Sequence, residues 1–516
     1  MANCIIFNGG TWNKEDWAIT QRTMGAYRVA TELEKAGYST FVFDFVIRFT
    51  FEEIKKVLDQ HLDKDTLWVG FSSTFYWAHP TVIKHTGNAD AFKLEDDHMF
   101  WTDKSDINDI INYVKEKSNA KIVYGGTKAE FFVGQDSTMD YYVTGLADNA
   151  VVGLTDYLKN GDKTRLLGCE EATNRDGGTS LIIDSSKYPE PTMDQLGIDW
   201  GKNPQWCIQH GEALGIEFAR GCIFKCKFCT YPLLGKKKGT YIRDIEAIKD
   251  EMIRNYEECG TIDYAISDDT TNDDMDKMIE LHKMITSLPF KPRFSGFFRV
   301  DLINRYPEQA DLISEMGVCG VFFGIETTQP KSAVSIGKGL HPNKVKDRLY
   351  WLKEKWKDKI NIGTGFILGL PHDTVEYFEE LAEWTCNADC PLDNIQFYPL
   401  HLNDTSKSDH KGLYVSEFNL HPEIYGYTFP GKNNYVRWDL EGQGLSYNFC
   451  QQVSRELNFR RAKYNKIASF DMTRYLNVGV SREDLHRLTH KELIEKYDMP
   501  ALNNAFLAKY KKALGL

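Results

Sequence analysis

Three cysteines stand close together near the middle of the chain, at Cys222, Cys226 and Cys229. They follow a short run at residues 215–219 that we predict to be a strand, so they lie on the loop after it. Three thiolates within eight residues suit one face of a cubane iron–sulfur cluster. Three protein ligands leave the fourth iron open for a substrate or cofactor, much as a catalytic zinc site keeps one position open. The spacing therefore predicts a [4Fe-4S] cluster.

A zinc knuckle and three incidental thiols are the alternatives. Structural zinc usually takes four ligands, often as two spaced pairs, and no fourth Cys or His follows Cys229 at such a spacing. The next cysteine is Cys259, at the end of a predicted helix. Cys386 and Cys390 have no third cysteine nearby, so we interpret them as ordinary thiols.

Composition narrows the class of protein. The chain has 516 residues, a net charge of −12 and a pI of about 5.6, which argues against a broad basic surface for nucleic acid. No apolar run approaches the ~20 residues of a membrane helix, and the N-terminus lacks the pattern of a signal peptide. We expect a cytoplasmic protein, where cysteines serve as thiols or metal ligands. Basic runs at 236–238 and 460–466 are expected to face water.

Strands and helices alternate over residues 1–160, which predicts a doubly wound α/β domain with a parallel sheet. The predicted strands are 3–7, 39–45, 66–72, 121–124 and 141–144. The predicted helices are 20–36, 51–62, 106–117 and 148–159. Residues 161–205 are rich in Gly, Asp, Ser and Pro, and we predict a connector there.

A second alternating block covers residues 206–405. Its predicted strands are 215–219, 262–267, 293–300, 319–325, 361–368 and 394–398, with helices at 243–258, 273–287, 307–316, 342–355 and 374–386. Six βα units are too few for a full eight-unit barrel, so we predict a partial (β/α)6 barrel. Residues 406–516, with helices at 444–466 and 490–514, form a mostly helical region that we expect to cover the barrel and shape a substrate pocket.

Polar side chains recur where the strands of this second block end. Ser267 and Asp269 follow one strand, Arg299 the next and Glu326 the one after. Parallel folds build their sites at the carboxyl ends of strands. The sequence therefore predicts that these side chains lie together beside the cysteine loop.

The Cys-x3-Cys-x2-Cys spacing, with the aromatic Phe228 just before the last cysteine, resembles the motif of the radical S-adenosylmethionine (SAM) superfamily. This resemblance implies that the open iron binds SAM. It also implies that the reduced cluster cleaves SAM to a 5'-deoxyadenosyl radical, which abstracts hydrogen from a substrate.

The resemblance extends over residues 206–402 and implies roles for single residues. Ser267 and Asp269 would hold the methionyl part of SAM, and Arg299 would pair with its carboxylate. Gly324-Ile325-Glu326-Thr327 is similar to a Gly-Ile-Glu-Ser stretch of the family, so Glu326 would reach polar groups of SAM. Two residues would pack on adenine: Phe228, and Gly365 at the start of Gly-Phe-Ile-Leu-Gly-Leu-Pro.

Residues 1–160 resemble the cobalamin-binding domain that precedes many radical SAM cores. The similarity rests on strand ends and turns that would approach a corrinoid: Ser72, Ser73, Gly125, Gly126, Thr127 and Gly145. The Asp-x-His-x-x-Gly motif of this domain is absent, and no histidine lies between Gly9 and Met24. The resemblance then implies cobalt without a protein histidine. The alternative is a domain that keeps the shape and holds no corrinoid.

The resemblance as a whole implies a cobalamin-dependent methyltransferase that acts on an unactivated carbon, with catalytic residues unassigned. The first alternative is a radical SAM enzyme that catalyses a rearrangement, cyclisation or oxidation, with or without cobalamin. The second is a non-catalytic iron–sulfur or nucleotide-binding protein. The expected partners are a small-molecule, peptide or nucleotide substrate and an electron donor such as flavodoxin or ferredoxin, with no membrane.

Overall fold

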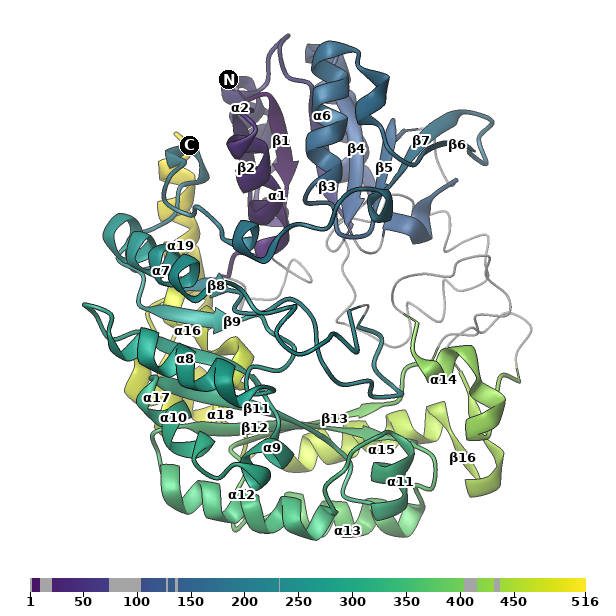
Figure 1. The fold of residues 1–516 in the computed structure, drawn as a ribbon, viewed down its shortest axis with the longest axis vertical. Coiled ribbons are helices and arrows are strands. Elements are labelled where there is room, and N and C mark those ends of the chain that lie inside the picture. The colour runs from purple at the N-terminus through teal and green to yellow at the C-terminus, as the bar shows by residue number, and fades with distance from the viewer. Residues whose placement is uncertain are drawn as a thin grey trace. The chain divides into compact units, whose positions relative to one another are not determined.

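The structure is a computed structural model. It describes residues 2–9, 21–73, 104–126, 129–134, 138–231, 233–402, 415–430 and 437–516. The chain divides into two compact units (Figure 1). The first unit comprises Met1–His210, Glu257–Cys259 and Asn503–Leu516. The second comprises Gly211–Tyr256 and Gly260–Leu502.

The first unit is built on a seven-stranded sheet with the order β2-β1-β3-β4-β5-β7-β6. Its strands are β1 (Cys4–Phe7), β2 (Thr40–Phe43), β3 (Trp68–Ser72), β4 (Lys121–Gly126), β5 (Tyr141–Thr144), β6 (Cys169–Thr173) and β7 (Thr179–Asp184). Its helices include α1 (Met24–Lys35), α2 (Phe51–His61), α5 (Lys104–Lys117) and α6 (Ala150–Asn160). The strands β1 and β2 are wholly buried, as a sheet covered on both faces requires. The predicted doubly wound fold is confirmed.

The segment predicted as a connector, residues 161–205, contains two strands that were not predicted. The strand β7 runs parallel to β5, and β6 pairs antiparallel with β7, so this hairpin extends the first sheet. In β6 the sequence Cys-Glu-Glu-Ala-Thr is exposed or half-buried along its whole length. An edge strand of this kind carries no apolar alternation from which it could be predicted.

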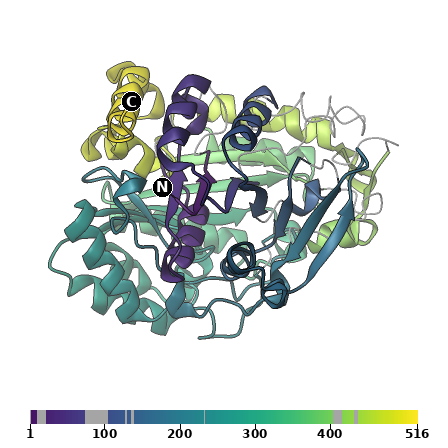
Figure 2. The same ribbon diagram turned by 90° about the horizontal axis from the view of Figure 1, so that it is seen from above.

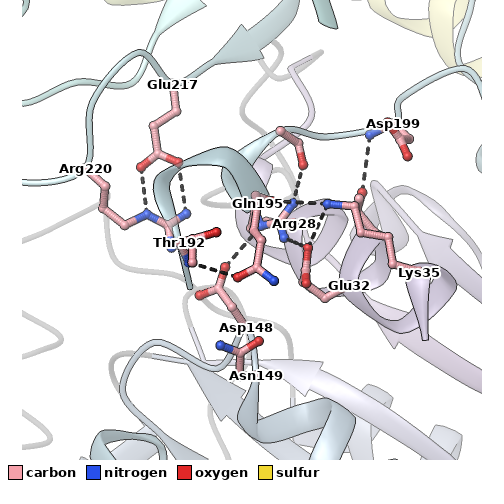
Figure 3. A network of polar contacts seen from close by, with 12 residues as sticks. Arg28, Glu32, Lys35, Asp148, Asn149, Thr192, Gln195, Asp199, Glu217 and Arg220 are labelled. Atoms are coloured by element: carbon pink, nitrogen blue, oxygen red, sulfur yellow. Dashed lines mark hydrogen bonds and ion pairs between the residues drawn. The ribbon is translucent and has the colours of Figure 1, made fainter. Parts of the chain in front are cut away.

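A buried polar network ties the segment after β7 to α1 in the first unit (Figure 3). The Arg28 guanidinium donates to Asp148, at 3.1 Å, and to Glu32 and the Gly197 carbonyl. Lys35 adds a hydrogen bond to Glu32, at 3.0 Å. Because both Arg28 and Asp148 are almost fully buried, removal of either would leave an uncompensated charge.

The end of the chain belongs to the first unit. The Asp44 amide donates to the Tyr510 hydroxyl (3.1 Å), and Lys511 pairs with Glu53 (2.8 Å). The predicted helix at 490–514 is two helices, α18 (His490–Lys496) and α19 (Met499–Ala513). Tyr497 between them has an extended backbone, and the Asp498 carboxylate accepts the Ala501 amide at the start of α19.

The second unit contains a six-stranded, all-parallel sheet with the order β13-β12-β11-β10-β9-β8, which confirms the predicted partial barrel. Figure 2 shows the green strands β11 to β13 side by side. The strands are β8 (Leu214–Ile216), β9 (Asp263–Ile266), β10 (Arg293–Phe298), β11 (Val318–Glu326), β12 (Asn361–Leu368) and β13 (Asn394–Pro399). The helices between them are α7 (Ile245–Cys259), α8 (Met275–Thr286), α9 (Val300–Arg305), α10 (Gln309–Glu315), α11 (Pro330–Ser335), α12 (Pro342–Trp356) and α13 (Val375–Thr385).

Asparagine side chains cover both edges of this sheet. At β13, Asn458 of α15 (Tyr447–Arg461) donates to the Phe397 carbonyl and accepts its amide, both at 2.9 Å. Asn465 does the same for Ile395. At the β8 edge, Asn477 of α16 (Met472–Asn477) exchanges hydrogen bonds with the Ala213 backbone. These amides satisfy strand edges that would otherwise pair with another chain.

The rest of the second unit is mostly helical, as predicted. It adds α14 (Glu417–Leu420), α17 (Arg482–Arg487) and a small unpredicted antiparallel sheet of β14 (Tyr427–Thr428), β15 (Asp439–Leu440) and β16 (Leu445–Ser446). The expectation that the basic run at 460–466 faces water was wrong for Arg461. This side chain is buried and donates to the Thr385 and Leu392 carbonyls. Among the described helices, none is long and apolar enough to cross a membrane.

Candidate iron–sulfur and cofactor site

The three cysteines lie on the loop that follows β8. The loop folds back on itself, since the Cys222 amide donates to the Leu233 carbonyl and the Lys236 amide donates to the Cys222 carbonyl. Gly221 has a φ of +122°, and a Cβ there would lie 3.2 Å from the Leu233 carbonyl oxygen. Only glycine adopts this conformation without strain, which is why it precedes the first cysteine. At the base of the loop, Arg220 forms a bidentate pair with Glu217 (Figure 3).

Each cysteine sulfur has a hydrogen-bond partner. The Thr270 hydroxyl lies 3.6 Å from the sulfur of Cys222. The Tyr231 amide donates to Cys229 at 3.5 Å, and an Arg299 guanidinium nitrogen donates to Cys226 at 3.7 Å.

The Tyr231 and Arg299 donors would stabilise thiolate ligands and tune a bound cluster, so the residues present fit a [4Fe-4S] group. Among the described residues, no group of three or more His, Cys, Asp or Glu side chains is close enough to bind a single metal ion. A cubane places each thiolate on a different iron, so its ligands need not converge on one point.

Burial raises the pKa of the Cys222 thiol and raises that of Cys229 to about 11. Without metal these thiols are therefore protonated near neutral pH. Only thiolates bind iron, so cluster loading must release protons from this loop.

Arg299 is the central charge of the site. Its guanidinium forms a bidentate pair with Asp301, at 2.9 and 2.7 Å, and lies 3.7 Å from the centroid of the Phe224 ring. Its backbone is held by the Asn272 side chain, whose oxygen accepts the Arg299 amide at 2.8 Å. Burial opposes ionisation of Asp301, but Arg299 outweighs it and holds the pKa of that carboxyl below its ordinary value. The guanidinium is thus fixed in place before any ligand arrives.

Glu326 ends β11 with a φ of +68°, a conformation that is uncommon for a residue with a side chain. Its carboxylate lies 3.8 Å from the Lys338 ammonium and occupies the space that a side chain at Gly324 would take. Burial raises the pKa of Glu326, while Lys338 and Arg299 oppose the rise. Backbone strain of this kind gathers at functional sites.

The other residues predicted for SAM binding have the following surroundings. The Ser267 hydroxyl donates to the Ile216 carbonyl at 3.2 Å. Asp269 accepts a hydrogen bond from Tyr231, and burial raises its pKa to about 6. Phe228 packs against the core of the second unit, and Gly365 lies within β12 beside the Phe322 ring. The structure brings the cysteine loop, Asp269, Arg299 and Glu326 to one edge of the sheet, and the individual roles remain predictions.

A buried charge network behind the loop was missed from the sequence. Asp268 accepts the Phe218 and Ala219 amides, at 2.7 and 3.1 Å, and so fixes the start of the cysteine loop. The fully buried Lys277 pairs with Asp273 at 2.6 Å and lies 3.8 Å from Asp268. Burial raises the pKa of Asp268 to about 7, with Lys277 opposing. Asp273 lies just before α8 and Lys277 in its first turn, and their separation of four residues was the signal available.

The residues predicted to approach a corrinoid lie at the carboxyl ends of three neighbouring strands in the first unit. Ser72 of β3 pairs in register with Gly125 of β4, and Gly126 pairs with Thr144 of β5. Ser73 donates its amide to the Gly125 carbonyl at 2.8 Å. Thr127 lies outside the described residues.

Two glycines at these strand ends have positive φ, +113° at Gly126 and +83° at Gly145. A Cβ at Gly126 would lie 2.8 Å from the Ser73 hydroxyl oxygen. Ser73 itself fills the space beside Gly126, whereas a Cβ at Gly125 would have only ordinary contacts, so the bare backbone at the end of β4 fits a corrinoid that approaches closely.

Comparison with known proteins decides the family of the second unit. Residues 216–385 match the model of the radical SAM superfamily, and the match covers both the cysteine loop and the polar strand ends. This chain carries a radical SAM domain. The SAM and [4Fe-4S] cofactors predicted from the sequence are those that this domain implies.

Two curated methyltransferases resemble the chain over part of its length. It is 26% identical over 290 residues to an uncharacterized methyltransferase, PH0819, of Pyrococcus horikoshii, which covers 54% of this chain and 60% of that protein. It is 25% identical over 202 residues to the bacteriochlorophyllide d C-12(1)-methyltransferase of Chlorobaculum tepidum, which covers 39% and 43%. The chain thus spans less than two thirds of the length of these relatives.

Two solved structures are similar in fold to the chain. The first is the radical SAM methyltransferase TsrM of Kitasatospora setae, determined with cobalamin and a [4Fe-4S] cluster (TM-score 0.56, 15% identity, 84% of this chain and 80% of that one). The second is the cobalamin-dependent SAM radical enzyme OxsB, determined with aqua-cobalamin and SAM (TM-score 0.52, 15% identity, 82% and 55%).

Proposed function

We propose that this chain is a cobalamin-dependent radical SAM methyltransferase that acts on an unactivated carbon. One observation carries the proposal: a parallel sheet with bare glycine strand ends and a sheet with a three-cysteine loop occur in one chain. The two methyltransferase relatives and the two cobalamin-bound structures with a similar fold support it. When bound, the cluster supplies the electron that cleaves SAM, and cobalamin supplies the methyl group.

The second unit would hold the cluster and SAM. Cys222, Cys226 and Cys229 bind three irons. Arg299, oriented by Asp301, pairs with the SAM carboxylate, and it also donates to the sulfur of Cys226. One guanidinium therefore links a cluster ligand with the bound SAM. Glu326, beside Lys338, accepts hydrogen bonds from polar groups of SAM.

The first unit would hold cobalamin. Asn8, the residue that directly follows β1, would not be a ligand to its cobalt. The Asn8 amide group donates to Asp44, at 2.9 Å, and accepts the Thr23 hydroxyl, at 2.8 Å. Both of its polar atoms are therefore occupied. No histidine occurs between Gly9 and Met24. This segment would then supply no histidine ligand to a bound cobalamin.

The reaction itself tests the proposal. The anaerobically reconstituted protein, given methyl-deuterated SAM, a reductant and a candidate substrate, is expected to form 5'-deoxyadenosine and a deuteromethylated product, both detected by mass spectrometry. The Cys226→Ser variant should form neither. 5'-Deoxyadenosine without methylation of a consumed substrate would favour the rearrangement, cyclisation or oxidation alternative. A loaded cluster that does not cleave SAM would contradict the radical SAM activity.

A further inference from the structure

The sheet of the second unit has one face toward its helices and one inner face. Phe298, Phe323 and Phe397 belong to the hydrophobic core on the helix side. Successive strand residues point to opposite faces, so Phe297, Phe322 and Tyr398 lie on the inner face. Phe297 is 36% exposed and Tyr398 is 46% exposed, although both sit within strands.

Two of these rings, Phe297 and Phe322, form one group with Phe470, which comes from the short helix η10 (Ser469–Asp471). The Phe322 centroid lies 5.5 Å from that of Phe297 and 5.4 Å from that of Phe470, in edge-on arrangements. The planes of Phe297 and Phe470 are nearly parallel, at 11°. We call Phe297, Phe322, Tyr398 and Phe470 the aromatic face.

A glycine makes room for the aromatic face. A Cβ at Gly365 would lie 3.3 Å from the Phe322 ring and 3.8 Å from the Tyr398 ring, so both rings reach across β12 at this position. Glycine within a strand weakens the strand and often marks a place of close approach. Gly365 therefore leaves the Phe322 and Tyr398 rings uncovered, although a glycine makes the sheet less stable at this position.

The aromatic face is continuous with the polar strand ends of the candidate site. Phe297 of β10 comes two residues before Arg299, which directly follows that strand, and Phe322 comes four residues before Glu326 along β11. At about 3.3 Å per residue, the rings lie roughly 7–13 Å below those charges. Because the Glu326 carboxylate occupies the space beside Gly324, it lies on the same inner face as Phe322.

We propose that the aromatic face binds the substrate, and that this substrate is a planar, conjugated ring system. The identity of the ligand as a substrate rests on the proposed function. Aliphatic side chains would bury an aliphatic substrate equally well, whereas each paired ring face favours a second aromatic ring about two- to tenfold beyond the effect of buried area. Sites for small molecules are mostly apolar, with a few polar groups at the margin, as Arg299 and Glu326 provide here.

A matched pair of probes tests the inference in the reconstituted full chain with saturating SAM. Isothermal titration compares 3-phenylpropionate, which carries a planar six-membered ring, with 3-cyclohexylpropionate, which carries the same acid on a puckered ring of the same number of carbons. The planar probe should bind at least tenfold more tightly. Phe297→Leu and Tyr398→Leu should each weaken it about two- to tenfold, as the loss of one aromatic pair implies.

The control variant is Phe459→Leu, which removes an aromatic ring that is 83% exposed on α15. It should bind the planar probe as the unchanged protein does, and thermal melting should show that all variants fold. Equal affinity for the two probes, no binding of the planar probe, or its displacement by SAM would overturn the inference. The readout is binding alone. A chain that binds the planar probe through the aromatic face but transfers no methyl group would therefore refute the proposed function separately.

Discussion

Cys226 differs from the other two loop cysteines because a guanidinium, that of Arg299, donates to its sulfur. A positive neighbour stabilises the thiolate that binds iron. We expect Cys226→Ser to lose most of its iron and its cluster absorbance near 400 nm after reconstitution. Cys386→Ser, which alters a thiol outside the loop, should keep both. Full iron content in the Cys226→Ser variant would contradict the cluster assignment.

The role of Arg299 in SAM binding can be tested by a conservative substitution. Lysine keeps the charge but cannot form the bidentate pair with Asp301. Arg299→Lys is expected to weaken SAM binding roughly ten- to a hundredfold, as the loss of a charged hydrogen bond implies. Titration calorimetry on the reconstituted protein measures the affinity for SAM, and the iron content shows whether the variant keeps its cluster. Arg305→Lys, on the exposed side of α9, is the control. Unchanged affinity in Arg299→Lys would remove this residue from the SAM site.

The buried carboxyl of Asp373 leads us to predict how the stability of the folded protein changes with pH. Burial raises its pKa to about 7, although its carboxylate accepts the Gly369 and Leu370 amides and the Ser332 hydroxyl. The folded protein thus favours the protonated acid. The contribution of Asp373 to the stability of the folded protein is therefore fully present near pH 4 and is lost as the pH rises through 7.

The Asp373→Asn variant stays neutral at every pH. Its melting temperature should fall less than that of the unchanged protein between pH 5 and pH 8. Parallel melting curves for the two proteins over this range would show that the Asp373 carboxyl does not titrate as described.

Single residues also show what a sequence can predict about a site. Spacing predicted that Arg299 and Glu326 lie beside the cysteine loop, because parallel strands bring their carboxyl ends to one edge. It could not predict the positive φ of Glu326 or the burial of Arg461, since both depend on neighbours far along the chain. Asp268 stood next to two predicted residues, and only its burial reveals that it fixes the loop.

At the scale of elements, the edge of β13 depends on α15. The Asn458 side chain satisfies both backbone groups of Phe397, so Asn458→Ala leaves two polar groups without these partners. Such a loss costs roughly 1–3 kcal/mol. Hydrogen exchange at the Phe397 amide should accelerate accordingly, while Gln452→Ala, on the exposed side of the same helix, should leave it unchanged. Equal exchange in the two variants would mean that α15 does not protect this edge.

The elements themselves were largely predictable, and the exceptions have physical reasons. The buried parallel strand β12 ends in the apolar run Phe366–Leu368 and was found at its observed bounds. The hairpin of β6 and β7 was missed because β6 is an exposed edge strand. The strands β14 to β16 have two residues each, too few for any alternation to show.

At the scale of the whole molecule, two α/β units follow one another, and the last residues, 503–516, return to the first unit. The order of the units was predicted from alternating strands and helices. The return of the C-terminus was not, because the contacts of Tyr510 with the β2 end join positions more than 450 residues apart. Long-range pairings of this kind leave no local pattern in a sequence.

Stoichiometric binding of cobalamin tests the central claim most directly. The chain is reconstituted anaerobically with iron, sulfide and hydroxocobalamin, desalted, and its corrinoid absorbance is compared with its iron content. The Gly125→Leu variant places a side chain at the bare end of β4, where a Cβ itself has only ordinary contacts. Gly442→Leu, in an open turn of the second unit, is the control.

We predict about one corrinoid per chain in the unchanged protein and in Gly442→Leu, and little or none in Gly125→Leu with the cluster intact. An unchanged protein that carries the cluster but retains no corrinoid would contradict cobalamin-dependent methyl transfer. It would leave a radical SAM protein of another reaction class.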